Sequence, residues 1–536
     1  MKSTAFRFAL LASALSISCI LNSGVTSRAT SANDRKLPAL IKVTPQAPAF
    51  LETERLNELL QRRARVAQAV GNKSFLILFS GEPRVYANDV DYPFRQENNL
   101  FYLTNLKQAG ATLVLLPGNT QFPEILFLPK RSPLAETWTG HMYSAQEAKQ
   151  ISGVKEIWNA TELDPFLKSI RNRQPYRPKP ENILLSDLPA SFEFKNGHGF
   201  EPLFAAAADD AAGVFMLVPR AQDSSEYRRE QQFSSDWAKV ASGYAVKNAW
   251  RVFNEMRLSK SPMELRLLQH AIDISTEAHE RSWLAAASAK WEYEIDAEVA
   301  YTFKLRNADN WGYPDIVGCG PNATTLHYIE SQSAVKPGDL LLMDVGAEYQ
   351  HYSADITRTI PVNGRFSPAQ AEVYQIVYDA QEAVAKAARP GVTLSDVNRA
   401  GTEVLKQGLL KLGLITDVES NQYRVWFMHS TSHWLGMNVH DVGGPAKFVP
   451  GAVFTNEPGI YVRPDALENK PGNWKDEEWE KFKAAVRPAF EKYKGIGVRI
   501  EDDLVITADG VEWMSKALPR KLSEVEEFIA KIRSGT

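Results

Sequence analysis

The chain has 536 residues, too many for one compact domain, and at roughly 100–200 residues per domain it predicts two or three folded units. Hydrophobic residues make up 44% and charged residues 23%, a globular balance that provides ample material for a core. The formal net charge of −3 gives no general attraction to nucleic acid or to an anionic membrane. We therefore expect no nucleic-acid partner, and substrate choice must come from a local site.

Residues 1–32 have the pattern of an export signal, which we expect to be removed. A basic start precedes an apolar run at residues 8–21, and a polar stretch follows. The run is too short to span a bilayer but suits the apolar part of a signal peptide. A lipoprotein cleavage site at Cys19 is poorly matched, and a buried N-terminal helix is the alternative interpretation. We expect an exported protein, periplasmic or secreted, with no stable membrane span and with Cys319 as its one cysteine.

Residues 45–225 are expected to form a smaller α/β N-terminal domain. Three apolar runs in this part predict buried strands, with the sequences FLILFSG, TLVLLPG and EILFLPK. Residues 226–258 follow, and the polar, charged stretch that opens them predicts a connecting segment.

Residues 259–525 are expected to form the second unit, which holds all the candidate catalytic residues. It opens with a capping box, in which Ser261 is the N-cap, Pro262 takes the first helical position and Glu264 lies three residues after the cap. A further helix starts after Ser367, and its apolar side chains at helical spacing are interpreted as core.

Residues 340–345 and 354–360 have the pattern of two neighbouring strands, and the first carries a carboxylate, Asp344, among apolar side chains. If the hairpin turn centres on residues 349–350, Asp344 directly faces Asp355, with Cβ atoms about 4.5–5.5 Å apart. Two ionised carboxylates at that distance repel each other, so a cation must lie beside them. A salt bridge with a nearby arginine is the simplest interpretation of this pair alone.

Three further side chains of metal-binding type lie at strand ends or among glycines: His433, Glu457 and Glu501. Each alone has an ordinary explanation as a packed or solvated group. Together with the two aspartates they make four carboxylates and one imidazole, a set that suits divalent ions such as Mn²⁺, with Co²⁺ or Zn²⁺ as substitutes. Two divalent ions would balance the four carboxylate charges, and carboxylates can bridge a pair of ions roughly 3.5–4 Å apart.

Five motifs are spread through residues 261–518: MDVGAEYQHYSADITRTIPVNGRF, GPNATTLHYIE, MHSTSHWLGMNVHDVG, TNEPGIYV and GIGVRIEDDLVIT. In these motifs the sequence resembles the dinuclear metallopeptidases of the pita-bread fold, and within them the Xaa-Pro aminopeptidases (aminopeptidase P). The stretch YPFRQENNLFYLTNLKQAGATLVLLP is similar to the N-terminal domain of the prolyl-specific members. The resemblance implies an α+β chain, in which a smaller α/β domain precedes a C-terminal pita-bread catalytic domain.

The resemblance also implies that the five ligands hold two divalent metal ions, for which we expect Mn²⁺. Asp344 and Asp355 would bind one ion. Asp355 and Glu501 would bridge the two ions. His433 and Glu457 would complete the second site.

Further roles follow from the same resemblance. His327 and His440 match histidines that contact substrate and help to stabilise the tetrahedral intermediate or move protons. His429 resembles another active-site histidine. Arg499 and Tyr461 match residues that surround the first metal-binding aspartate. The plain alternative for each is a side chain that only packs or completes a hydrogen bond.

The implied activity is hydrolysis of the peptide bond between an N-terminal residue and a proline in second position. A hydroxide that bridges the metals attacks the carbonyl, the metals hold the oxyanion, and an imidazole assists. Proline lacks an N–H and has a fixed φ, so it needs a dedicated pocket, lined partly by the first domain or by a neighbouring subunit. We therefore expect peptides with proline in second position as partners, and a homo-oligomer.

Three alternatives stay open from the sequence. A prolidase performs the same chemistry on dipeptides only, and a methionine aminopeptidase shares the ligand set without needing the first domain. A non-catalytic binding protein of the same fold is the third. Residues 463–495 are longer than the family pattern predicts and contain an amphipathic helix, DEEWEKFKAAVRPAFEKY, which would cover the site, form a subunit contact or decorate the surface.

Overall fold

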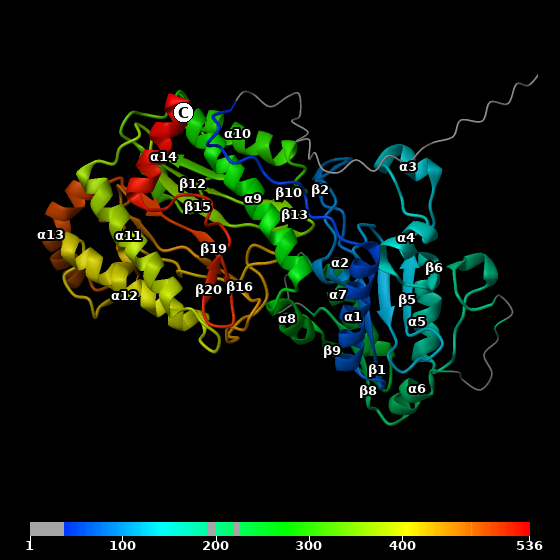
Figure 1. Cartoon of the computed structure of the whole chain (residues 1–536). Helices are drawn as coiled ribbons and strands as arrows, with labels where there is room; N and C mark the ends of the chain where they lie inside the picture. Colours follow the sequence, from blue (N-terminus) through cyan, green and yellow to red (C-terminus); the bar gives the residue numbers. More distant parts are fainter. Residues whose placement is uncertain (1–36, 190–191, 193–198, 219–225, 473, 536) are drawn as a thin grey trace, which may run out of the picture.

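The computed structural model describes residues 37–189, 192, 199–218, 226–472 and 474–535. The predicted export signal, residues 1–32, lies outside these ranges. The described residues form two domains that lie side by side and are joined through helix α8 (Trp250–Leu258), as Figure 1 shows. Within the described ranges, no helix is both long and apolar enough to cross a membrane.

A seven-stranded mixed sheet forms the centre of the first domain, in the order β7-β6-β5-β4-β1-β8-β9. Its strands are β1 (Ser74–Phe79), β4 (Thr112–Leu115), β5 (Glu124–Leu128), β6 (Ile157–Asn159), β7 (Ile183–Leu185), β8 (Ala212–Met216) and β9 (Tyr244–Asn248). The helices of this domain are α1 (Glu52–Val70), α2 (Asn98–Thr104), α3 (Pro133–Thr139), α4 (Ala145–Ser152), α5 (Leu163–Arg171), α6 (Glu201–Ala208) and α7 (Arg228–Val240), and a small hairpin adds β2 (Val85–Ala87) and β3 (Val90–Asp91). The three predicted strands are confirmed as β1, β4 and β5, and every residue of β1 is buried.

The segment at residues 226–258 is not the connection that its composition predicted. It contributes α7 and then β9, which pairs in parallel with β8 at the edge of the first sheet. Trp237 of α7 is buried, and its ring lies 5.9 Å from the ring of Phe75 in β1. The polar composition was misleading because most of α7 faces solvent and only a narrow face is buried. Within this segment, α8 is the part that links the domains; residues before α1 form a second connection, since Lys42 and Thr44 contact α9.

Helices flank several small sheets in the second domain. The helices are α9 (Pro262–Ala285), α10 (Glu292–Leu305), α11 (Pro368–Ala387), α12 (Leu394–Leu412), α13 (Asp476–Tyr493) and α14 (Leu522–Ser534). The strands are β10 (Asn310–Trp311), β11 (Ile316–Cys319), β12 (Leu340–Val345), β13 (Ala347–Tyr349), β14 (Tyr352–Ser353), β15 (Ile356–Pro361), β16 (Val453–Asn456), β17 (Gly459–Tyr461), β18 (Gly497–Arg499), β19 (Asp502–Ile506) and β20 (Val511–Trp513). Helix α9 packs on β12 to β15 and α11 packs on β16 to β18, so the strands lie between the α9–α10 pair and the α11–α12 pair (Figure 1).

Both predicted helix starts in this domain are confirmed as capping boxes. The Ser261 hydroxyl accepts from the backbone N–H of Glu264, and the Glu264 carboxylate accepts from the backbone N–H of Ser261. Ser367 and Gln370 form the same reciprocal pair at the start of α11. These bonds satisfy backbone donors that the first turn of a helix otherwise leaves free.

The strand register differs from the prediction that Asp344 directly faces Asp355. In β12 and β15, Asp344 pairs with Thr357 instead. The turn centres on Gln350 and His351, which both have positive φ (51° and 68°), one residue later than predicted. Two adjacent residues with positive φ form the tight turn whose twist suits a hairpin. Asp355 therefore lies two positions from the partner of Asp344, diagonally across the same face.

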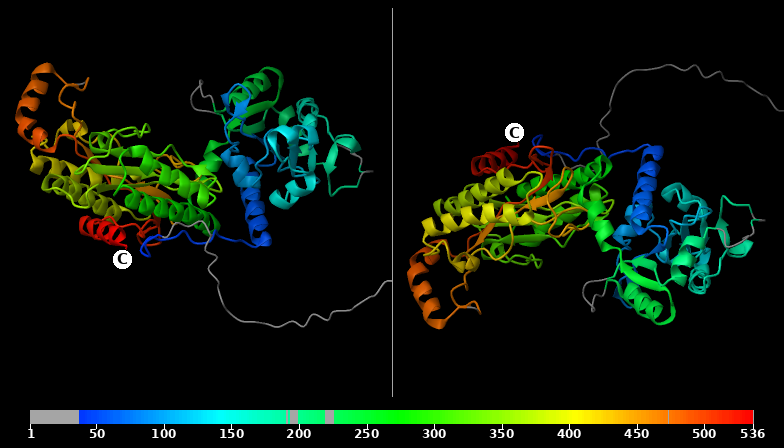
Figure 2. Two further views of the ribbon diagram at one scale, coloured as in Figure 1. Left: turned by 90° about the horizontal axis from the view of Figure 1, so that it is seen from above. Right: turned by 90° about the horizontal axis from the view of Figure 1, so that it is seen from below.

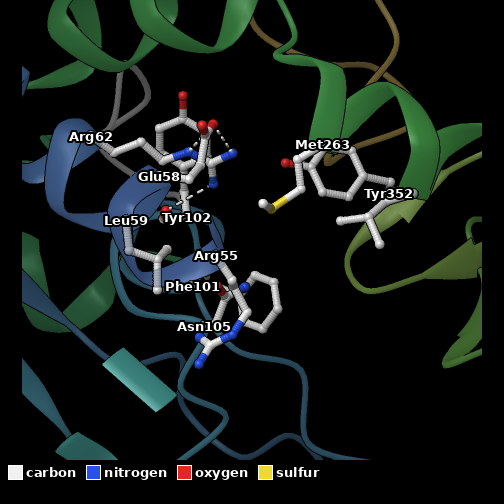
Figure 3. A pocket seen from close by; sticks show the side chains of 10 residues that line it. Arg55, Glu58, Leu59, Arg62, Phe101, Tyr102, Asn105, Met263 and Tyr352 are labelled. Carbon is white, nitrogen blue, oxygen red and sulfur yellow. Dashed lines mark hydrogen bonds and ion pairs between the residues drawn. The ribbon is translucent and has the colours of Figure 1, made fainter. Parts of the chain in front are cut away.

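The two domains meet at a closely packed junction. Arg62 of α1 lies 3.3 Å from the carboxylate of Glu264 at the start of α9, and the Tyr352 hydroxyl donates to the same carboxylate over 2.8 Å. Figure 3 shows Arg62 and Tyr102 on one wall of a small pocket there, with Met263 and Tyr352 on the other. The cavity of about 20 Å³ has room for about one water molecule, so the junction is nearly filled.

The predicted helix within residues 463–495 is confirmed as α13. Trp479, Phe482 and Val486 are buried in a cluster that includes Trp426, whose ring centroid lies 6.5 Å from that of Phe482. Figure 2 shows α13 at the end of the second domain that is farthest from the first domain. This position agrees with the interpretation of α13 as a helix that decorates the surface.

Replacing Phe482 with alanine should destabilise the second domain. Loss of a buried phenylalanine side chain leaves a cavity and typically costs about 3–5 kcal/mol. The free energy of unfolding, measured in urea, should fall by that amount. Lys481→Ala is the matched control, because the Lys481 side chain is 75% exposed and its removal should change the free energy by no more than about 0.5 kcal/mol. Equal effects of both substitutions would contradict the burial of this face.

Candidate metal centre

Three of the predicted ligands form a compact group. Asp355, His433 and Glu501 each place one ligand atom within 4.8 Å of the others. The His433 Nε2 atom lies 3.3 Å from Asp355 Oδ2 and 3.4 Å from Glu457 Oε1, so Glu457, the fourth predicted ligand, adjoins this group. The Tyr313 hydroxyl lies 2.7 Å from Asp355 Oδ1 and 2.5 Å from Asp344 Oδ1, so it joins Asp344, the fifth predicted ligand, to the group. The structure thus brings all five predicted ligands together.

Three of these carboxylates lie at breaks between strands. Asp355 precedes β15, Glu457 follows β16, and Glu501 lies between β18 and β19. The backbone N–H of Glu501 donates to the carbonyl of Thr357, and that of Glu457 donates to the carbonyl of Thr431. The backbone N–H of Asp355 donates to the carboxylate of Asp503 over 3.1 Å. Because these bonds hold the chain at each break, the three carboxylates are fixed where the small sheets meet.

Burial makes this acidic group costly when it carries no cation. Burial, and then repulsion from the neighbouring carboxylates, raises the pKa of Glu457 to about 7. The same causes raise the pKa of Asp355 and, far more, that of Glu501. Burial opposes charge on His433, yet its hydrogen bond to Asp355 and the charge of Glu457 raise its pKa to about 9. The group therefore needs either bound protons or bound cations.

The donor set fits divalent metal ions. The Nδ1–H of His433 donates to the backbone carbonyl of Trp434 over 3.1 Å, so Nε2 is the nitrogen that faces the carboxylates. This hydrogen bond fixes the ring orientation and tautomer, as outer partners of metal-binding histidines commonly do. Four carboxylates and one imidazole are ligands that divalent ions accept. The residues present would hold two such ions with a balanced charge.

The predicted positions of Arg499 and Tyr461 beside the first aspartate agree with the structure. Arg499 Nη2 lies 2.5 Å from Asp344 Oδ2, and Arg499 Nη1 donates to the Tyr461 hydroxyl over 3.0 Å. Arg499 Nε donates to the Thr357 hydroxyl, which in turn donates to Glu501 over 2.6 Å. The guanidinium therefore orients one carboxylate directly and a second through a hydroxyl.

His429 has both ring nitrogens engaged. Its Nδ1–H donates to the carbonyl of Ser430 over 2.8 Å, and its Nε2 lies 2.8 Å from the Tyr461 hydroxyl. Burial, and then the charge of Arg499, lowers the pKa of His429 to about 3. A neutral ring that accepts from Tyr461 orients this hydroxyl and, through it, Arg499. The catalytic role predicted for His429 stays a prediction.

His440 and His327 lie on the solvent side of the centre. Both side chains are exposed, and the His440 ring centroid lies 4.4 Å from that of His433, edge to face. Partial burial, and then the neighbouring imidazoles of His433 and His327, lowers the pKa of His440. A neutral imidazole at the open side of the centre can exchange a proton with a bound peptide.

Two further residues of the centre were not predicted from the sequence. Tyr313 contacts both aspartates, and Thr357 contacts Glu501 and Arg499. A single tyrosine before an apolar run, or a threonine in a strand, carries no signal by itself. Pairing β12 with β15 in the observed register would have placed Thr357 opposite Asp344.

Known proteins match the chain across both domains. Metallopeptidase family M24 matches residues 266–508, and the aminopeptidase P N-terminal domain matches residues 59–177. The Xaa-Pro aminopeptidase of Haemophilus influenzae is 33% identical over 88% of this chain and 97% of its own length. The Xaa-Pro aminopeptidase of Escherichia coli is 31% identical over 89% of this chain and 98% of its own.

Solved structures agree with these matches. Aminopeptidase P from Escherichia coli with the inhibitor Pro-Leu has a TM-score of 0.72 at 30% identity, and the match covers 91% of this chain and 100% of that one. An aminopeptidase of Pseudomonas aeruginosa has a TM-score of 0.71 at 27% identity, over 90% and 99% of the two chains.

Fold and site together define a metal-dependent exopeptidase, in which a smaller N-terminal domain precedes a pita-bread catalytic domain. The chain belongs to the Xaa-Pro aminopeptidases of metallopeptidase family M24. The predicted α+β fold and the predicted enzyme class are confirmed. The comparisons do not favour the prolidase or the non-catalytic alternative.

Replacing Asp355 with asparagine should lower the amount of bound metal. The amide keeps the size of the side chain but removes the charge from the residue at the centre of the group. Equilibrium dialysis against Mn²⁺, followed by elemental analysis, should show the loss of at least one of two ions per chain. Asp509→Asn is the control, because Asp509 is exposed and its hydrogen bond is to Thr507, which is not a predicted ligand. Unchanged metal content in Asp355→Asn would contradict the predicted ligand role.

The stability of the metal-free protein should fall as the pH rises. The folded state raises the pKa of Glu457 from 4.5 to about 7, so between these values the folded chain binds a proton that the unfolded chain has released. The contribution of this proton to the free energy of unfolding is therefore complete below the unfolded pKa of 4.5 and is lost as the pH rises through the folded pKa of about 7. Bound divalent ions replace the proton and should remove the decline. Urea unfolding between about pH 5 and about pH 8 measures how the free energy of unfolding changes with pH, once in chelator and once in Mn²⁺. A rise of stability in chelator would contradict this expectation.

Proposed function

We propose that this enzyme releases the N-terminal residue of peptides that have proline in second position. The observation that carries the proposal is the group of Asp355, His433 and Glu501 within 4.8 Å, joined by the other two predicted ligands and open toward His440. The names of the relatives in Haemophilus influenzae and Escherichia coli support this substrate class. We propose Mn²⁺ as the metal, because carboxylate oxygens dominate the donor set.

Divalent ions held by these residues supply Lewis acidity toward the scissile carbonyl and lower the pKa of water. The chain's own residues fix that chemistry in place. Tyr313, Arg499 and Thr357 orient the carboxylates through the bonds described above. His440, with its lowered pKa and exposed position, is free to donate to or accept from the peptide beside the scissile bond. His327 extends the same exposed side.

Proline in second position suits a dedicated enzyme. Its tertiary amide has no N–H, so a groove that pairs with that group would lose a contact. A pocket that accepts the ring needs apolar walls beyond the metal centre. The first domain, or a neighbouring copy of it, is the proposed source of these walls.

We also propose export and self-association. The basic start and apolar run within residues 1–32 support export to the periplasm or the medium, with removal of that segment. Large apolar side chains are exposed around β2, β3 and α3, with Trp138 at 83% and Leu134 at 76%. Surfaces of this kind commonly mark protein–protein contacts, which supports a homo-oligomer.

The proposal is tested by release of the first residue from a tetrapeptide with proline in second position. The mature protein should cleave it after Mn²⁺ addition, and Asp355→Asn should lose most of that activity. A tetrapeptide with alanine in second position and an X-Pro dipeptide serve as substrate controls, and liquid chromatography measures the free amino acid. Cleavage of the dipeptide alone would indicate a prolidase. No cleavage of either proline substrate by metal-loaded protein would overturn the proposal.

A further inference from the structure

The loop that carries His440 has little structure of its own. We call residues 436–441 the His440 loop; all six are described, and none of them belongs to a helix or strand. Two backbone hydrogen bonds are local to the loop. The Gly436 N–H donates to the carbonyl of Asn438 over 3.2 Å, and the Asp441 N–H donates to the carbonyl of Trp434, two residues before the loop, over 2.9 Å. The position of His440 therefore depends on contacts from other parts of the chain.

The first domain supplies two of these contacts. Arg95 Nη2 donates to the carbonyl of Met437 over 2.7 Å. Asn98, a buried residue at the start of α2, donates from Nδ2 to Asn438 Oδ1 over 2.7 Å and to the Met437 carbonyl over 3.3 Å. Arg95 is itself held by the carboxylate of Glu348, with Nε 2.8 Å from one oxygen and 3.0 Å from the other. We call Arg95 and Asn98 the interdomain clamp.

The end of the His440 loop is held separately by the linking helix. Asp441, which directly follows His440, accepts from Arg257 Nη2 over 2.5 Å and lies 3.5 Å from Lys260 Nζ. Arg257 also donates to Asn99 Oδ1 over 2.8 Å. All of these side chains are buried, so this end of the loop is fixed by charge pairs that water does not weaken.

The start of the loop is tied to the second domain, because the carbonyl of Gly436 accepts from the N–H of Ser353 over 2.9 Å. Between the two fixed ends, the backbone of Met437 and the side chain of Asn438 are held by the clamp. His440 follows Asn438 by two residues, so a shift at Asn438 moves the imidazole relative to His433. The clamp residues reach the loop from the side of the first domain, and their hydrogen bonds within the loop are to Met437 and Asn438.

We propose that Arg95 and Asn98 are positioning residues for His440, so that the first domain sets the geometry of the catalytic histidine as well as lining the substrate pocket. This inference rests on the proposed function, because it assigns His440 a part in turnover. A misplacement of about 1 Å can cost on the order of 100-fold in rate, so a loosened loop should slow the chemical step. Binding of the peptide, which the metals and pocket dominate, should change much less.

The test combines Arg95→Lys with Asn98→Ala in the full-length mature protein. Lysine keeps a positive charge near Glu348 but loses the fork that reaches Met437, and alanine removes both donations from Asn98. We expect kcat on the tetrapeptide to fall by about 10- to 100-fold, with KM changed by less than about twofold and with unchanged metal content. In a His440→Ala background, the same pair of substitutions should lower kcat little further. The clamp is proposed to act on kcat through His440, so its effect disappears when that imidazole is already absent.

Lys107→Ala is the matched control for the clamp. Lys107 lies 2.9 Å from Asp309 and so also crosses between the domains, but neither residue contacts the His440 loop. This variant should keep the kcat of the parent protein. An equal loss of kcat in Lys107→Ala would show a general effect of loosening the junction and would overturn the inference.

Hydrogen–deuterium exchange gives a readout that does not depend on activity. Backbone amides of residues 436–441 should exchange faster in the clamp variant, while those of α9 keep their protection. Unchanged exchange in the loop, an unchanged kcat, or a full loss of kcat that persists in the His440→Ala background would each overturn the inference. A parent protein that does not cleave the tetrapeptide would contradict the proposed function instead, and exchange would still show whether the clamp holds the loop.

Discussion

The second domain is organised around one electrostatic constraint, the burial of four carboxylates and one imidazole in contact with each other. Such a group repels itself when it is ionised, and burial, followed by that repulsion, raises the pKa values of Glu457 and Glu501. The chain offsets part of it with Arg499 on Asp344 and with hydroxyl groups from Tyr313 and Thr357. The four carboxylate charges equal the charge of two divalent ions, so an arrangement that is unfavourable alone suits a metal centre.

The small sheets explain how one chain can meet this constraint. Each of three ligands lies at a point where the chain passes from one short strand to the next, and the hydrogen bond of its backbone N–H holds the chain there. A single long sheet would direct alternate side chains to opposite faces and could not gather ligands from separate hairpins. Helices α9 and α11 cover the strands on their outer sides, so the ligands are fixed by a packed core.

The first domain is part of this arrangement through its junction with the second. Glu264 caps helix α9 and also meets Arg62 of the first domain, so one carboxylate serves a helix start and a domain contact. Buried charge pairs around Arg257 and Asp441 continue the junction to the loop beside the metal centre. Because these contacts are desolvated and specific in geometry, the two domains hold a fixed relation, on which the proposed positioning of His440 depends.

The sequence by itself determined the capping box of α9, the start of α11 and three strands of the first sheet, because each of these depends on residue types at short, regular spacing. It also determined the ligand types of the centre, because the five side chains lie in separate motifs that each combine a metal-binding residue with a strand end or glycines. It did not determine that Asp344 pairs with Thr357, since a shift in the centre of a turn by one residue changes every pair in a hairpin. It also did not reveal strand β9, whose pairing partner β8 precedes it with helix α7 between. The contacts of Tyr313 with two aspartates, and of Arg95 and Asn98 with the His440 loop, join segments far apart along the chain. Only tertiary structure decides such contacts, because no local pattern in the sequence records which distant segments pack together.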